Sequence, residues 1–128
     1  MRTLINPNQV SGNQNYSHGV LVNSPARFLF IAGQVGRDLD GSIPEGIEAQ
    51  TEIAMRNLAD VLEASNMSME DIVETTVYLL SREDNVGFDK VRSKWMRGLR
   101  PASTKLYISG LAHPHMLCEV QATAVCPA

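Results

Sequence analysis

The order of apolar and polar positions divides the chain into segments of two different periods. Residues 16–23 (YSHGVLVN) and 28–34 (FLFIAGQ) are rich in β-branched and aromatic residues, which is typical of strands. A turn separates the two segments, so we expect them to pair as a hairpin. Residues 2–5 are a candidate for a further, short edge strand.

After a second turn at residues 38–41, the period changes from two to 3.6. Apolar and small residues recur at spacings of three and four, which predicts an amphipathic helix. The helix is expected to end near Asn66, because asparagine tolerates the left-handed conformation of a helix cap. Residues 68–71 (SMED) have the spacing of a capping box and predict one short turn. The apolar stripe of the helix consists of Ile47, Thr51, Ala54, Met55, Leu58, Val61, Leu62 and Ser65.

The rest of the chain predicts three more strands and a second helix. The strand segments are residues 73–80, 103–110 and 116–124. Between the first two of them, Phe88, Val91 and Trp95 mark one face of a helix, which Gly98 and Pro101 end. The order β-β-β-α-β-α-β-β predicts a single α+β domain over residues 1–128, with one sheet and both helices packed on one of its faces.

This arrangement leaves the opposite face of the sheet without a cover. An exposed apolar face of that size usually marks an interface. We therefore expect a closed oligomer in which the sheets of neighbouring subunits face one another. The apolar residues assigned to the uncovered face are Val77, Leu79, Leu106, Ile108, Val120 and Ala122.

Composition narrows the classes of partner. The formal net charge of −3 comes from 14 acidic and 11 basic residues, and the basic residues do not cluster. Binding to nucleic acid or to an anionic membrane is therefore not expected. No stretch resembles a secretory signal, and no run approaches the ~20 apolar residues of a membrane span. A soluble cytoplasmic protein is the expectation.

Cysteine and histidine content indicates neither a disulfide framework nor a metal site. Two cysteines, Cys118 and Cys126, are too few for a framework, and Cys118 is expected to be a small buried residue. His113 and His115 lie close together, but Pro114 makes their segment a turn and no carboxylate recurs at ligand spacing. No metal and no cofactor are predicted.

Six short motifs, in order over nearly the whole chain, resemble those of one known family. They are NYSHGV (15–20), LFIAGQVG (29–36), NLADVLEA (57–64), DIVETTVYL (71–79), RPAST (100–104) and CEVQATA (118–124). Each motif alone is weak, but together they resemble the Rid family, also called YjgF.

The resemblance implies a chorismate-mutase-like α+β subunit and a homotrimer whose sheets form a central barrel, with a ligand cleft at each subunit interface. Archetypal members are enamine/imine deaminases that hydrolyse 2-aminoacrylate and related products of pyridoxal-phosphate enzymes without cofactor or metal. In them an arginine in a Pro-Ala-Arg-Ser type motif binds the substrate carboxylate through its planar fork. A strand glutamate places and activates water, and a tyrosine closes the pocket.

Position by position, the resemblance matches Tyr16 to the tyrosine and Glu119 to the glutamate. Ser103 stands at the arginine position, and Ala32 stands where the archetype often has a serine before Gly-Gln. Gly33 is expected to serve a close backbone approach or a bulge, and its surroundings line the cleft in this family. Without the arginine, activity on 2-aminoacrylate is expected to be absent or weak.

Two cations are candidates for binding an anion in its place. Ser103 and Lys105 lie on the same side of a strand, two rises of ~3.3 Å apart, so Lys105 can point into the cleft that Ser103 faces. Arg92, on the second predicted helix, is the other candidate.

Structural interpretations of the charged strand residues stay open beside the functional ones. Although the resemblance favours a functional role, Glu119 is also compatible with a carboxylate that reaches solvent or pairs with a neighbouring cation. Lys105 is equally compatible with an exposed edge residue that discourages strand association.

The leading functional hypothesis is hydrolysis of a small imine or enamine in an interface cleft, with Glu119 as general base. A non-catalytic, small-molecule-binding trimer is the alternative, because a fold does not determine a function. An endoribonuclease or translation inhibitor is a third possibility, which the acidic balance argues against.

Overall fold

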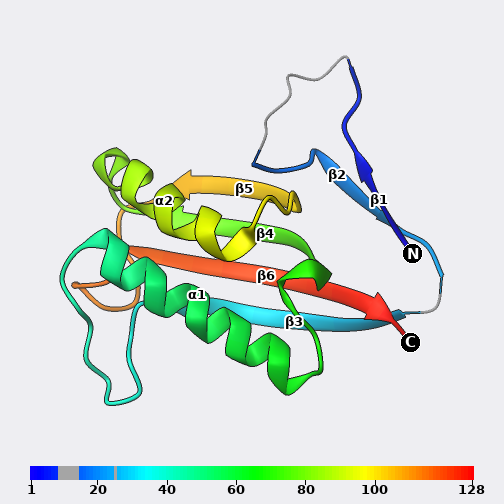
Figure 1. Cartoon of the computed structure of the whole chain (residues 1–128). Helices are drawn as coiled ribbons and strands as arrows, with labels where there is room; N and C mark the ends of the chain where they lie inside the picture. Colours follow the sequence, from blue (N-terminus) through cyan, green and yellow to red (C-terminus); the bar gives the residue numbers. More distant parts are fainter. Residues whose placement is uncertain (9–14, 25) are drawn as a thin grey trace.

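The computed structural model describes residues 1–8, 15–24 and 26–128. Within these ranges, the order of strands and helices is the one that the sequence predicts (Figure 1). The strands are β1 (Arg2–Ile5), β2 (Gly19–Val22), β3 (Ala26–Val35), β4 (Ile72–Leu79), β5 (Ala102–Tyr107) and β6 (Cys118–Pro127). The helices are α1 (Ile47–Ala64) and α2 (Asn85–Met96), with short 3-10 turns η1 (Met69–Asp71) and η2 (Arg82–Asp84).

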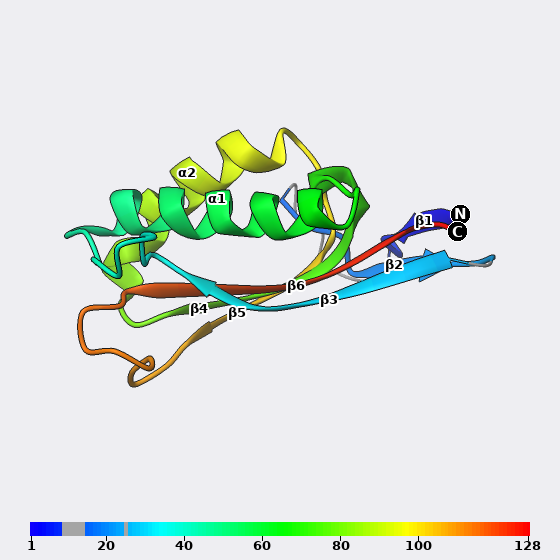
Figure 2. The same ribbon diagram turned by 90° about the horizontal axis from the view of Figure 1, so that it is seen from below.

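The main sheet of the described chain has four strands in the order β3-β6-β4-β5. β6 is antiparallel to both of its neighbours, and β4 and β5 are parallel to each other. Figure 2 shows α1 and α2 on the same face of this sheet. The α+β fold class and the placement of both helices on one face are therefore confirmed.

The expected hairpin between residues 16–23 and 28–34 is wrong. β2 pairs with β1 in a separate two-stranded ribbon, whereas β3 pairs with β6 over its whole length. The composition of a strand does not specify its partner. In the structure the strands pair with partners of equal length, since β3 and β6 have ten residues each and β1 and β2 have four each. The turn expected at residues 23–26 includes residue 25, which lies outside the described residues.

The face of the main sheet beneath the helices holds the core. Leu58 and Leu62 of α1 and Phe88 of α2 are fully buried against it. Four residues that the sequence analysis assigned to the uncovered face belong to this core instead: Val77, Leu79, Val120 and Ala122, which are 0–3% exposed. The assignment was wrong by one residue of register, which moves every side chain of a strand to the other face.

The uncovered face, called the open face below, carries a different set of side chains. Phe28 and Phe30 of β3 are 59% and 78% exposed, with their rings stacked at 6.4 Å between centroids. Leu106 of β5 is 45% exposed, as predicted, and Ile108 lies beyond the end of β5. The face also carries polar pairs, such as Tyr78 and Gln121, in which the Tyr78 hydroxyl donates to Gln121. The face is partly apolar, as expected, but through phenylalanines at its β3 edge.

Both predicted features at the end of α1 are confirmed. Asn66 has a φ of 57°, the left-handed conformation expected beyond a helix end. Ser68 forms a capping box with Asp71, whose Oδ2 accepts from the Ser68 amide at 2.8 Å. The chain therefore turns sharply from α1 into β4.

One buried polar side chain, Gln50 of α1, joins the helix to two loops. It is 1% exposed, and its Nε2 donates to the carbonyls of Pro44 (2.9 Å) and His115 (2.8 Å). Its Oε1 accepts from the amide of Leu117 at 2.8 Å. Gly36 permits this contact, since a Cβ there would lie 2.5 Å from the Gln50 Cβ. The start of β6 is thus held against α1.

We predict that Gln50→Leu lowers the free energy of unfolding by about 2 kcal/mol or more. The substitution removes three part-buried hydrogen bonds, and each group left without a partner away from water costs up to about 1–3 kcal/mol. Urea denaturation measures the loss, and Glu52→Leu, at an exposed position of the same helix, is the control. Equal stability of Gln50→Leu and wild type would show that water replaces these bonds without cost.

Candidate functional site

Four of the predicted site residues line one cavity, called the β5 cavity below. It has a volume of about 420 Å³ and lies between α2, β5 and the segment before β2. Those four residues are Tyr16, Arg92, Ser103 and Lys105, and Asn85 and Asp89 also line it.

Strand alternation and a short parallel bridge bring these residues together. Ser103 and Lys105 point to the same side of β5, and the hydroxyl of Thr75 donates to Ser103 Oγ at 2.9 Å. Ser17 forms a parallel bridge with Ala102, and its amide donates to the carbonyl of Pro101 at 2.9 Å. This bridge carries Tyr16 to the edge of β5.

A contact that the sequence analysis missed holds Tyr16 in place. The guanidinium of Arg100 donates to the carbonyl of Tyr16, at 3.3 Å from Nε and 3.2 Å from Nη2. The Tyr16 ring packs edge-on against His18 at 5.3 Å between centroids.

Lys105 is bound by two residues of α2 that the sequence analysis also missed. Its Nζ donates to Asp89 Oδ1 at 2.8 Å and to Asn85 Oδ1 at 2.5 Å, and lies 5.5 Å from the centre of the Phe88 ring. Asn85 and Asp89 are four residues apart, so they lie one above the other on the helix. That spacing, next to the predicted apolar face of α2, is the signal that could have found them. Lys105 is therefore paired and not a free edge lysine.

Arg92 has a buried guanidinium whose hydrogen bonding is incomplete. It is 7% exposed, and its Nη2 has no partner in the part of the chain that the structure describes. Burial lowers the pKa of this guanidinium, and the negative charge of Asp89 partly opposes that effect. Arginine nevertheless stays protonated in proteins, so Arg92 brings a positive charge to the β5 cavity.

The other three predicted residues lie around β3 and β6. Glu119 pairs in register with Val35 of β3 and Tyr78 of β4, and alternates with Val120 of the core, so it faces the open face. The register between β3 and β6 shifts between Ile31 and Gln34, where Ala32 and Gly33 form a bulge.

Gly33 makes room for Glu119. A Cβ built on Gly33 would overlap the carboxylate of Glu119, and in the described structure the nearest atoms all belong to that side chain. Gly33 was expected to serve either a bulge or a close approach, and the structure shows both at this residue. The neighbouring Ala32 is exposed.

Glu119 and Lys105 do not share a cleft within one chain. Lys105 lies on the helix side of the sheet and Glu119 on the open face, and Glu119 is not among the described residues that line the β5 cavity. The candidate site residues of one chain therefore form two groups on opposite faces of the sheet, called half-sites below.

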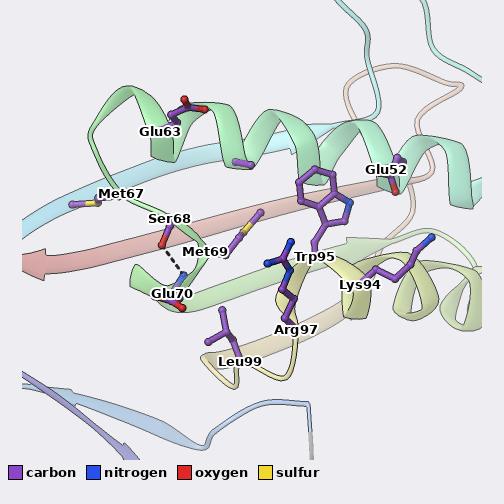
Figure 3. A pocket seen from close by; sticks show the side chains of 11 residues that line it. Glu52, Glu63, Met67, Ser68, Met69, Glu70, Lys94, Trp95, Arg97 and Leu99 are labelled. Atoms are coloured by element: carbon purple, nitrogen blue, oxygen red, sulfur yellow. Dashed lines mark hydrogen bonds between the residues drawn. The ribbon is translucent and has the colours of Figure 1, made fainter.

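A larger cavity of about 800 Å³ lies between α1, η1 and the end of α2 (Figure 3). Figure 3 shows the indole of Trp95 between the two helices, near Met69 and Arg97. Its described lining contains three acidic and two basic residues, and none of the predicted site residues line it. Its volume alone therefore does not make it the candidate site.

Neither cysteine, nor His113 or His115, is among the described residues that line the β5 cavity. Cys118 is fully buried beside Thr51, as expected, and burial raises the pKa of its thiol to about 11. His113 and His115 lie 5.4 Å apart between ring centroids. In residues 1–8, 15–24 and 26–128, no three His, Cys, Asp or Glu side chains form a group that could hold a metal ion. The same residues include no helix that is long and apolar enough to cross a membrane.

Comparison with known proteins shows the family. The family model described as "Endoribonuclease L-PSP" matches residues 7–126. The chain belongs to this family. Its relatives include Rid and RutC proteins, so the resemblance inferred from the six motifs is confirmed.

Individual members of the L-PSP family are similar over most of their length. A RutC family protein of Pyrococcus horikoshii is 34% identical over 76% of this chain and 78% of its own. A rat protein named 2-iminobutanoate/2-iminopropanoate deaminase is 28% identical over 86% of this chain and 79% of its own. A solved Rid protein of unknown function from Yersinia pestis is 30% identical, with a TM-score of 0.85 over 96% of this chain and 97% of that one.

We predict that Gly33→Ala displaces the Glu119 side chain and leaves the fold intact. The added methyl group overlaps only the movable end of that side chain, so the free energy of unfolding should change by less than about 1 kcal/mol. A crystal structure of the variant would show Glu119 in another rotamer. Gly110→Ala, where a Cβ meets nothing within 4 Å, is the control. A shift of β3 with Glu119 unmoved would contradict the prediction.

Proposed function

We propose that this protein is a Rid-type hydrolase that deaminates a small, reactive enamine or imine metabolite in the cytoplasm. The observation that carries the proposal is the position of Glu119, whose carboxylate lies on the open face in the space that Gly33 leaves. Membership of the L-PSP family supports it, as do relatives named 2-iminobutanoate/2-iminopropanoate deaminase.

The chemistry requires one base, one water molecule and an electrophilic carbon. Water adds to the C=N carbon while Glu119 accepts its proton, and the resulting carbinolamine loses ammonia to give a carbonyl product. An enamine reaches the same route after protonation on carbon gives the imine. The balance is imine plus water to ketone plus ammonia, so the step needs neither an oxidant nor a cofactor.

A homotrimer forms part of the proposal, because one chain separates the two half-sites. Phe28, Phe30 and Leu106 give the open face exposed apolar surface that a neighbouring copy would bury. In a closed trimer, Glu119 of one subunit would stand beside the β5 cavity of the next, which would complete the site with a residue from each copy.

Ser103 favours a second candidate, a trimer that binds small molecules without turnover. The Ser103 hydroxyl accepts a hydrogen bond from Thr75 and cannot form the bidentate pair that an arginine makes with a carboxylate. We expect activity on 2-aminoacrylate to be weaker than in an archetypal deaminase for the same reason.

We predict that Glu119→Gln lowers imine hydrolysis at least about 100-fold, because it removes the general base while preserving side-chain size. Ammonia release is measured on 2-imino acids generated in situ by an amino-acid oxidase. Glu74→Gln is the matched control, since Glu74 is an exposed glutamate on the same face, where it accepts from Thr123 at 3.2 Å.

Three results would contradict this proposal. Full turnover in Glu119→Gln would remove the base from the mechanism. Ligand binding by wild type without ammonia release would favour the non-catalytic trimer. RNA cleavage by nuclease-free protein that survives ~200 mM salt would support the activity in the family description, despite the net charge of −3.

We predict that Phe30→Glu converts a trimer of about three times 14.0 kDa into monomers, because it places a charge in the proposed interface. Light scattering with size-exclusion chromatography measures the mass. Leu39→Glu, at a fully exposed position outside the sheet, should leave the trimer unchanged. A wild-type monomer at micromolar concentration would remove the shared site.

A further inference from the structure

One side of α2 carries a polar strip that faces β5. Asn85, Asp89 and Arg92 follow one another at spacings of four and three, so their side chains lie along the same side of the helix. All three line the β5 cavity, as does Lys105 from the strand below. The strip therefore forms the helical wall of the cavity.

Arg92 is the member of this strip whose bonding is incomplete. Its residue is more than nine-tenths buried, and Nη2 has no hydrogen-bond partner within residues 1–8, 15–24 and 26–128. A buried charged donor without a partner destabilises the fold, so such groups are normally satisfied by protein, water or ligand. We infer that Arg92 binds the carboxylate of a small 2-imino monocarboxylate; the identity of this ligand rests on the function proposed above.

The charges around the β5 cavity leave one positive charge without a counter-ion. The described lining contains two cations, Arg92 and Lys105, and one carboxylate, Asp89. Asp89 is already paired, since its Oδ1 lies 2.8 Å from Lys105 Nζ. Residues 9–14 and 25 have no ionisable side chain and cannot supply the missing negative charge. A monoanion would balance the cavity.

A neighbouring Glu119 is the other anion that the proposed trimer could bring to Arg92. A direct pair with a guanidinium would favour the ionised carboxylate and make Glu119 a weaker base, which conflicts with its role in hydrolysis. The carboxylate of the substrate has no such conflict. It would also fix the C=N carbon relative to the base, which aids the reaction by orientation.

Size and charge together select the ligand class. The cavity volume of about 420 Å³ admits a small organic acid with water around it. A second carboxylate on the ligand would add a negative charge near Asp89, and a neutral carbonyl compound would leave Arg92 without a counter-ion. Small monocarboxylates should therefore bind more tightly than dicarboxylates or amides.

The first test measures binding of 2-oxobutanoate, a stable product of imine hydrolysis, by calorimetric titration. Arg92→Gln should weaken binding at least about tenfold, because a charge-assisted hydrogen bond is lost. Arg92→Lys, which keeps the charge but not the planar fork, should give an intermediate affinity. Lys94→Gln, on the exposed side of the same helix, should bind like wild type, and 2-oxobutanamide should bind none of the proteins. No binding by wild type, or equal binding by Arg92→Gln, would overturn the inference.

The second test separates Arg92 from Lys105. If Lys105 only neutralises Asp89, Lys105→Met should weaken binding, because Asp89 then becomes available to Arg92. The double variant Lys105→Met/Asp89→Asn has the same net cavity charge as wild type and should recover most of the affinity. If the double variant binds as weakly as the single one, Lys105 holds the anion directly and the assignment to Arg92 is wrong.

These tests do not depend on turnover. Binding of 2-oxobutanoate that depends on Arg92, without any ammonia release, would leave this inference standing and remove the proposed reaction. Hydrolysis that depends on Glu119, with the same KM in Arg92→Gln as in wild type, would support the proposed reaction and contradict the role of Arg92. If Arg92 is instead the partner of a neighbouring Glu119, Arg92→Gln and Glu119→Gln should lower the melting temperature equally, with no change in 2-oxobutanoate binding, and the inference would fail.

Discussion

Coverage of one face of the main sheet by α1 and α2 is the constraint on which the arrangement of the site depends. On β6, Val120 and Ala122 are buried beneath the helices, so Glu119 has to face the other way. On β5, Ser103 and Lys105 face the helix side, where α2 passes over them. Core packing therefore places the candidate base and the candidate cations on opposite faces of one sheet.

Under the proposed function, this separation links catalysis to assembly. A base on the open face can act on a ligand in the β5 cavity only if the face of one copy meets the cavity of another. The exposed phenylalanines of β3 provide a driving force, since full burial of a phenylalanine side chain contributes about 1.5–3 kcal/mol. Under the proposed function, the same apolar surface would stabilise the trimer and bring the two half-sites together.

The local pattern of apolar and polar residues was sufficient to predict the helices and strands. It was not sufficient to predict which strands pair or which face of a strand is buried. The helical period of α1 and the capping box at Ser68 were predicted because both depend on neighbouring residues only. β4 was assigned to the wrong face because it has apolar residues at both parities, among them Val73, Val77 and Tyr78. The hairpin prediction failed because pairing of β3 with β6 joins residues about 90 positions apart, which no local signal reports.

The candidate site shows the same limit. Ser103, Lys105 and Arg92 were found from the strand pattern and the resemblance, and the structure brings them to one cavity. Asn85 and Asp89 were missed because a polar pair at helical spacing is normally an exposed face. Their role becomes visible only when β5 is known to lie beside α2 and Lys105 is seen between them.

Arg92, the proposed anion-binding residue, lies on a helix, so its direction depends on how that helix packs on the core. Phe88 and Val91 of α2 are buried in the core, and Asp89 and Arg92 each follow one of them directly. The rotation of α2 about its axis that buries Phe88 and Val91 therefore also sets the direction of Asp89 and Arg92. A core substitution that turns the helix would move Arg92 and the partner of Lys105 together. Packing of α2 thus controls the geometry of the β5 cavity. Arg92 Nη2, which has no hydrogen-bond partner among the described residues, is held there at a cost in stability that an anion would offset.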